Sequence, residues 1–194
     1  MDAAYRVRTK ESPYVARHTP SPRHPTKRQK AVAVLLARAD ANFHAILRRA
    51  DPAILSSTPG DAAPVPVPAV VAAINHAGQW PPHILHSSRL PRTLTHIRQT
   101  TALLALQLCA GPASVIAHEL GRLNRSSIML AAASARQRLA HGEHATLDLF
   151  AAALVTLQDD HPGSPGRLDD DLRDLFGETL QRHQAPPSTP SPGL

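Results

Sequence analysis

The stretch RQTTALLALQLCAGPASVIAHELGRLNRSSI, residues 98–128, decides how this chain folds. It predicts a long apolar helix, a break near Pro112, a short helix that ends near Leu120, and a second helix beginning after Gly121. Glycine most readily adopts the left-handed conformation that ends a helix, and Asn124 is then a good N-cap for the next one. Two helices joined by a three-residue turn containing glycine are typical of a helix-turn-helix.

Apolar residues recur at helical spacing on both sides of this turn, which predicts that each helix packs one face on a core. Before the second helix, Val115, Ile116, Leu120 and Leu123 have this spacing, and the second helix carries Ile128, Ala131, Ala132, Ala135 and Leu139. In a helix-turn-helix the first residues of the second helix face base edges in the major groove. The candidate base-reading residues are therefore all polar: Asn124, Arg125, Ser126 and Ser127.

These residues, with Arg98-Gln99 and the long apolar helix before them, resemble the C-terminal DNA-binding domain of the bacterial replication initiator DnaA. The resemblance covers residues 66–158. Where the family begins its second helix with Asp-His-Thr-Thr-Val, this chain has Asn-Arg-Ser-Ser-Ile. The resemblance implies a Trp-repressor-like helical bundle that binds boxes of a replication origin. It also implies phosphate or minor-groove contacts by flanking side chains, for which the candidates are Arg89, Arg92, Arg98, Gln99 and Arg122.

The altered signature changes what the second helix can read. Arg125 is the strongest candidate, because a guanidinium can donate two hydrogen bonds to guanine O6 and N7. Asn124 suits two roles, a helix cap or an adenine reader, and the cap is favoured. Ser126 and Ser127 keep the hydroxyls of the family's threonines but lose the methyl groups that contact thymine. For each of these residues a solvated position on the surface is the alternative interpretation.

Charge is unevenly distributed along the chain. The net charge is +6, with eleven Lys or Arg against three acids in residues 1–50 and three Arg against seven acids in residues 159–194. A basic arm beside a basic helical domain is typical of a protein that binds polyanions, although a solvated tail has the same composition. Nineteen prolines and only 3% aromatic residues favour a small all-α domain, with a core of Ala, Leu, Ile and Val, between disordered tails.

Composition divides the chain into five segments. We expect a disordered basic arm (1–29), an amphipathic helix (30–49), a Pro-rich linker (50–67), the DNA-binding domain (68–158), and an acidic, Pro/Ser-rich tail that contains a short helix (159–194). The amphipathic helix packs on the domain or binds a partner protein, and the sequence leaves both open. Its apolar face is formed by Val32, Leu35, Leu36, Ala39, Phe43, Ile46 and Leu47.

Within the DNA-binding domain, three further apolar segments predict helices. Residues 69–80 begin the core with Val70, Val71, Ile74 and Trp80. The helix over residues 94–110 is apolar nearly all round, so we expect it to be the buried axis of the domain. A last helix follows Gly142, over residues 145–157.

The sequence offers no constellation typical of an enzyme, a cofactor site or a metal site. His83 with His86, and His141 with His144, have helical spacing, but no cysteine pair or carboxylate cluster accompanies either pair. The acidic run 169–171 is interpreted as a solvated helix cap. No phosphate-binding loop of an ATPase is present. Cys109 is the only cysteine and is expected to be a buried apolar residue.

We therefore expect a protein of the cytoplasm that binds double-stranded DNA sequence-specifically and acts in replication initiation or its regulation, without a membrane partner. The alternative is a degenerate initiator-like domain that serves as a protein-interaction module. Its partner would be a replication or regulatory protein bound through residues 30–49.

Overall fold

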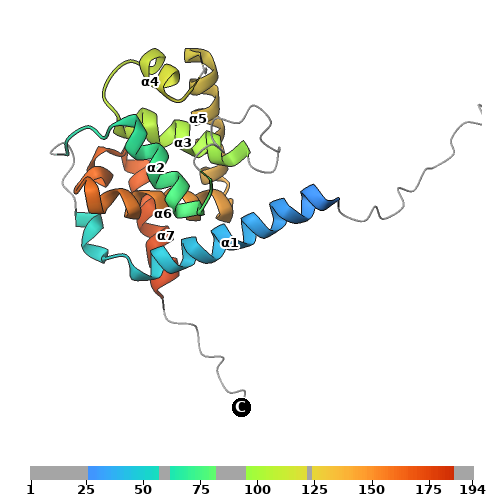
Figure 1. Ribbon diagram of the computed structural model, residues 1–194. Helices are drawn as coiled ribbons and strands as arrows, with labels where there is room; N and C mark the ends of the chain where they lie inside the picture. Colours follow the sequence, from blue (N-terminus) through green and yellow to red (C-terminus); the bar gives the residue numbers. More distant parts are fainter. Residues whose placement is uncertain (1–25, 57–61, 82–94, 122–123, 186–194) are drawn as a thin grey trace, which may run out of the picture.

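The computed structural model describes residues 26–56, 62–81, 95–121 and 124–185 (Figure 1). These residues form helices joined by short connections, with no strand among them, which confirms the all-α class. The helices are α1 (Lys27–Arg49), α2 (Val67–Gly78), α3 (Thr95–Leu108), α4 (Ala113–Glu119), α5 (Arg125–Ala140), α6 (His144–Asp160) and α7 (Asp170–Gln184), with two 3₁₀ turns, η1 (Pro52–Ser56) and η4 (Ser164–Arg167). In the described part of the chain, no helix is both long and apolar enough to cross a bilayer.

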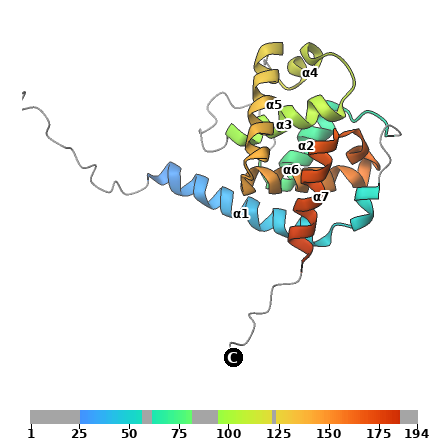
Figure 2. The same cartoon turned by 180° about the vertical axis from the view of Figure 1, so that it is seen from behind.

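Two helices share the centre of the fold. Helix α3 is buried along most of its length, as its all-round apolar pattern predicts. Helix α6 is equally buried, and it packs against α1, α2, α3, α5 and α7 (Figures 1 and 2). The prediction of one buried axis at 94–110 was therefore incomplete, because the small residues Ala151–Ala153 let several helices approach α6 at once.

Helix α1 begins three residues earlier than predicted, at Lys27. The Thr26 hydroxyl accepts a hydrogen bond from the Gln29 N–H (3.2 Å), and the Gln29 side chain accepts one from the Thr26 N–H (2.7 Å). This capping box satisfies two backbone donors and moves the start of the helix into the segment assigned to the basic arm. The rest of that arm, residues 1–25, lies outside the described residues.

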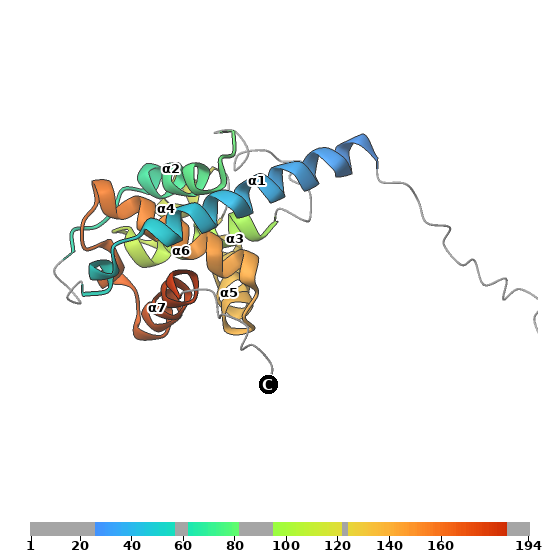
Figure 3. The ribbon, with the colours of Figure 1, turned by 90° about the horizontal axis from the view of Figure 1, so that it is seen from below.

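The amphipathic face of α1 packs inside the molecule, chiefly through its C-terminal half. Ala39, Phe43 and Leu47 are buried, and the Phe43 ring meets the Trp80 ring edge to face, with 6.1 Å between centroids. Gly78 lies under that tryptophan, so close that a Cβ at Gly78 would be 2.3 Å from the ring. The N-terminal half of α1 extends beyond the other helices (Figures 1 and 3).

The segment 50–67 was predicted to be a linker, and this prediction was wrong for the parts that the structure describes. Ile54 in η1 and Val65 before α2 are both buried, and the Val65 N–H donates to the Leu108 carbonyl (3.0 Å). Prolines prevent a long α-helix here, but they still allow a 3₁₀ turn and an extended strand-like path with apolar side chains turned inward.

The acidic segment 159–194 is not a tail over residues 159–185. Asp169 caps α7 by accepting from the Leu172 N–H (3.1 Å), and Leu172, Phe176 and Leu180 are buried against the other helices. The short helix predicted within this segment is present as α7, and its apolar face completes the core. Residues 186–194 lie outside the described residues.

Candidate functional site

The predicted helix pair is present as α4 and α5, with Leu120 and Asn124 as the flanking cap residues. Gly121 between them has a φ of 82°, in the left-handed region that glycine adopts without strain. Ile116 on α4 and Ile128 on α5 are fully or almost fully buried, which anchors both helices on the core. Arg122 and Leu123 lie outside the described residues.

The start of α5 is capped as the sequence predicts. The Asn124 side-chain oxygen accepts a hydrogen bond from the Ser127 N–H (2.7 Å). The same oxygen is the atom that would accept from adenine N6, so its use in the cap leaves Arg125 as the main candidate for direct base recognition. A helix N-terminus also carries a partial positive charge, which favours a nearby phosphate.

All four predicted base-reading residues are exposed, and Ile128 directly after them is buried. The N-terminus of α5 lies at the end of the molecule that carries α4, at the top of Figure 1 and away from α7. The acidic residues of α7 therefore do not cover this surface. The Arg125–Ser127 turn presents one guanidinium and two hydroxyls to solvent.

The apolar residues around this turn were not all placed correctly by the periodicity. Val115 was predicted to pack inward, but 47% of it is exposed. On α5, Met129 and Leu130 are 51% and 70% exposed, and neither was singled out in the sequence. Leu130 follows Ser126 by one helical turn, so both lie on the outward face of α5.

Arg98 and Gln99 lie half-buried in the first turn of α3. The Gln99 side-chain oxygen accepts from Arg138 Nε (3.0 Å), and Arg138 also donates to both Glu143 carboxylate oxygens (2.9 and 2.7 Å). Arg138 is in the last turn of α5, about 20 Å along the helix axis from Arg125 at 1.5 Å per residue. The structure therefore places Gln99 beside the end of α5 rather than its start. Arg89 and Arg92 lie outside the described residues.

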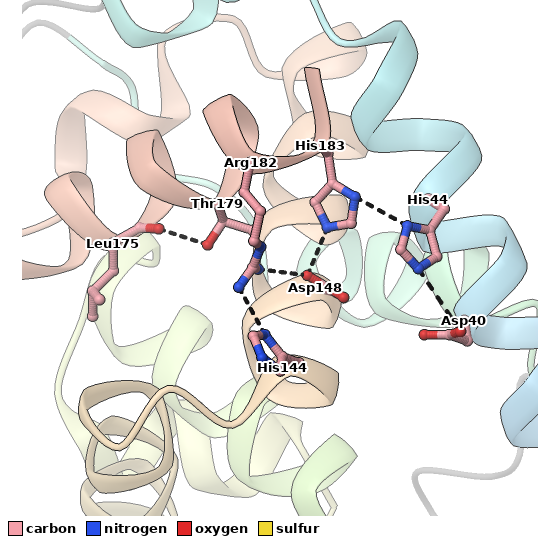
Figure 4. A network of polar contacts seen from close by, with 8 residues as sticks. All are labelled: Asp40, His44, His144, Asp148, Leu175, Thr179, Arg182 and His183. Atoms are coloured by element: carbon pink, nitrogen blue, oxygen red, sulfur yellow. Dashed lines mark hydrogen bonds and ion pairs between the residues drawn. The ribbon is translucent and has the colours of Figure 1, made fainter. Parts of the chain in front are cut away.

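A second cluster of polar side chains joins α1, α6 and α7 (Figure 4). Asp148 of α6 is buried, and its Oδ1 atom accepts from His183 Nε2 and Arg182 Nη2, each at 2.9 Å. His183 Nδ1 lies 3.0 Å from His44 Nδ1 of α1, and His44 Nε2 lies 3.8 Å from Asp40 Oδ2. The cluster borders a cleft of about 870 Å³.

The described residues that the sequence analysis considered as metal ligands make hydrogen bonds or ion pairs within the protein. His141 Nδ1 lies 2.6 Å from the Gln137 carbonyl, and His144 Nδ1 accepts from Arg182 Nη1 (2.8 Å). Asp169 caps α7 and pairs with Arg136 of α5, in agreement with its interpretation as a cap. His83 and His86 lie outside the described residues.

No known protein family, no curated protein and no solved structure matches this chain.

Proposed function

We propose that this chain binds double-stranded DNA, with α4 and α5 acting as the two helices of a helix-turn-helix. The observation that carries the proposal is the outward presentation of Arg125, Ser126 and Ser127 on a helix start that Asn124 caps and Ile128 anchors. A rigid helix N-terminus with exposed polar residues is the geometry that enters a major groove. In this arrangement Arg125 reads guanine, and the serine hydroxyls contact phosphate.

The exposed apolar side chains of α5 fit the same proposal. Leu130 is aligned with Ser126 one turn further along the helix, where it would meet the groove wall. Apolar side chains contact the C5-methyl group of thymine, which is the contact that the family's threonines provide and the serines here do not. We therefore expect the preferred site to contain a guanine for Arg125 and a neighbouring thymine for Leu130.

The resemblance of residues 66–158 to the initiator domain supports a duplex of the origin-box kind, and with it a role in replication initiation or its regulation. Gln99 lies near the other end of α5 from Arg125 and is already bonded to Arg138, so it is a weaker candidate for phosphate contact than the sequence implied. The proposal does not require Gln99, because the start of α5 carries the base contacts.

One observation favours a second candidate function, a protein-interaction module. Val115, Met129 and Leu130 are large apolar side chains exposed on neighbouring helices, and exposed apolar surface of this kind often marks a protein interface. Val34, in the half of α1 that extends beyond the other helices, is a further exposed apolar side chain.

Selection of bound duplexes from a random pool tests the proposal. We expect one sequence family to be enriched, and a plot of log affinity against log salt with a slope of roughly −4 to −5, if about five phosphates are neutralised. On the selected site, Arg125→Ala should cost about 1–3 kcal/mol and relax one base position.

Arg49→Ala is the matched control, because Arg49 is an exposed arginine in the last turn of α1, which has no extensive contact with α5. It should leave the enriched sequence unchanged. Two results together would overturn the proposal in favour of the interaction module. No duplex would be enriched, and the wild type and Arg125→Ala would bind random DNA with equal affinity.

A further inference from the structure

The polar cluster between α1 and α6 contains three potential metal ligands. Asp40 and His44 are four residues apart on α1, so they lie on the same face of that helix. Asp148 of α6 faces them, and one ligand atom from each residue lies within 4.8 Å of the others. The three side chains meet at the edge of the cleft (Figure 4).

The hydrogen bonds behind these ligands are compatible with a metal-binding tautomer of His44 when both histidines are neutral. A carboxylate can only accept, so His183 Nε2, 2.9 Å from Asp148 Oδ1, carries a proton. In neutral His183 the other nitrogen, Nδ1, is then an acceptor. Because His44 Nδ1 lies 3.0 Å from it, His44 Nδ1 must be the donor of that contact.

The consequence is an unprotonated Nε2 on neutral His44. This nitrogen lies 3.8 Å from Asp40 Oδ2, a distance too long for a hydrogen bond. In this tautomer neither the nitrogen nor the carboxylate carries a proton. A nitrogen lone pair and two carboxylates, of which Asp148 is also paired with Arg182, thus face the same small volume. Such a set of lone pairs suits a cation.

We propose that Asp40, His44 and Asp148 bind a zinc ion. One imidazole nitrogen and two carboxylate oxygens are ligands that zinc accepts, and three protein ligands leave a fourth position for water. Ligand atoms around tetrahedral zinc, at roughly 2.0–2.1 Å from the metal, are about 3.3 Å apart, so the site must contract slightly on binding. Asp40 and His44 can move inward because their side chains are 61% and 40% exposed.

The side chains behind the ligands support this site. Asp148 is held by Arg182 and His183 through Oδ1, which leaves its second oxygen for the metal. His44 donates from Nδ1 to His183, and this is the hydrogen bond that commonly fixes the tautomer of a metal-binding histidine. His183 is therefore a positioning residue. Arg182, the cation nearest to Asp148, is already engaged with that carboxylate and with His144.

Calorimetric titration of the full chain with zinc chloride, in a buffer that does not chelate zinc, tests the proposal. His44→Gln removes the nitrogen ligand at a partly exposed position, and Asp40→Asn removes one carboxylate charge. Each variant should weaken zinc binding at this site by at least about tenfold. The chain has twelve histidines, so His118→Gln is the matched control: His118 is exposed on α4, and its loss should leave this binding step unchanged.

Zinc should also raise the melting temperature of the wild type and of His118→Gln, because the ligands join α1 to α6 in the folded state only. His44→Gln, folded by circular dichroism, should show a much smaller rise. Equal zinc affinity and equal stabilisation in His44→Gln and the wild type would overturn the proposal. Competition by magnesium or calcium at concentrations similar to that of zinc would overturn the choice of metal, since these ions prefer all-oxygen sites.

Discussion

At the scale of single residues, the start of α5 assigns helix capping and the proposed base contacts to different side chains. Asn124 uses its side-chain oxygen to cap the helix, so the backbone of the first turn is held in place. Arg125 and the two serines after it are exposed on that turn and are free of this structural task. A short polar sequence can therefore start a helix and still leave polar side chains exposed for the contacts that we propose.

Asp169 has a stabilising role that depends on pH. Partial burial acts to raise the pKa of its carboxyl, but hydrogen bonds from Arg136 and the Leu172 N–H, with the charges of Arg136 and Arg173, outweigh burial. The pKa in the folded protein is therefore below its ordinary value of 3.8. The unfolded chain binds a proton more tightly at this carboxyl than the folded protein does, so acid favours unfolding.

We predict that the stabilisation by Asp169 is fully present above about pH 5 and is lost as the pH falls through the ordinary pKa to the lower folded value. Asp169→Asn, which keeps a capping oxygen, should therefore be less stable than the wild type near neutral pH, with a difference that shrinks in acid. Urea unfolding at a series of pH values measures this. The same charge removal at exposed Glu178, as Glu178→Gln, is the control. A difference that stays constant down to pH 2.5 would contradict the prediction.

At the scale of elements, α7 shows that composition is a poor guide to whether a segment joins the core. The helix has two acidic residues in its first turn, yet Leu172, Phe176 and Leu180 are buried. A hydrogen bond also ties the end of α7 to the end of α1: the Gln184 side chain donates to the Ala50 carbonyl (2.8 Å). The helix therefore closes the side of the molecule formed by α1 and α6 (Figure 2).

We predict that Phe176→Ala destabilises the whole protein by about 3–5 kcal/mol, because a fully buried aromatic ring is replaced by a cavity. The total helicity, followed by circular dichroism during thermal unfolding, should be lost in one transition at a lower temperature than in the wild type. Glu178→Ala, on the exposed face of the same helix, should change the free energy of unfolding by no more than about 0.5 kcal/mol. An unchanged melting temperature for Phe176→Ala would mean that α7 is a separate appendage.

At the scale of the whole molecule, Cys109 reports on the integrity of the core. It follows α3, is buried, and is the only cysteine of the chain. Burial, with a smaller contribution from Glu119, raises the pKa of its thiol to about 11, although Arg167 acts in the opposite direction. The thiolate is the reactive form, so the folded protein keeps this group nearly inert.

We predict that Cys109 in the native protein reacts with an alkylating reagent at pH 8 at least about a hundredfold more slowly than free cysteine. The reaction should reach the rate of free cysteine in denaturant, since the thiol is then exposed. Mass spectrometry of samples quenched over time measures both rates, and free cysteine in the same denaturant is the control. Fast alkylation of the native protein would show that the end of α3 opens locally.

The sequence alone determined the helices and much of the helix-turn-helix candidate. Apolar periodicity and the Gly121 and Asn124 signals depend on neighbours a few residues away, so local rules were sufficient to place α4 and α5. The start of α1 is also encoded locally, because Thr-Lys-Arg-Gln at 26–29 is a capping-box pattern. The prediction placed the start later because this pattern lies within a basic, Pro-rich segment.

Only the tertiary structure decided which faces are covered and which polar groups meet. Periodicity marks an apolar face without saying what packs on it, so the docking of α7 and the exposure of Leu130 were not predictable from the pattern. The His44–His183 contact joins residues 139 positions apart in the chain. Such a contact exists only because α1, α6 and α7 pack side by side, and that packing follows from the shape of the whole core rather than from any local run of residues.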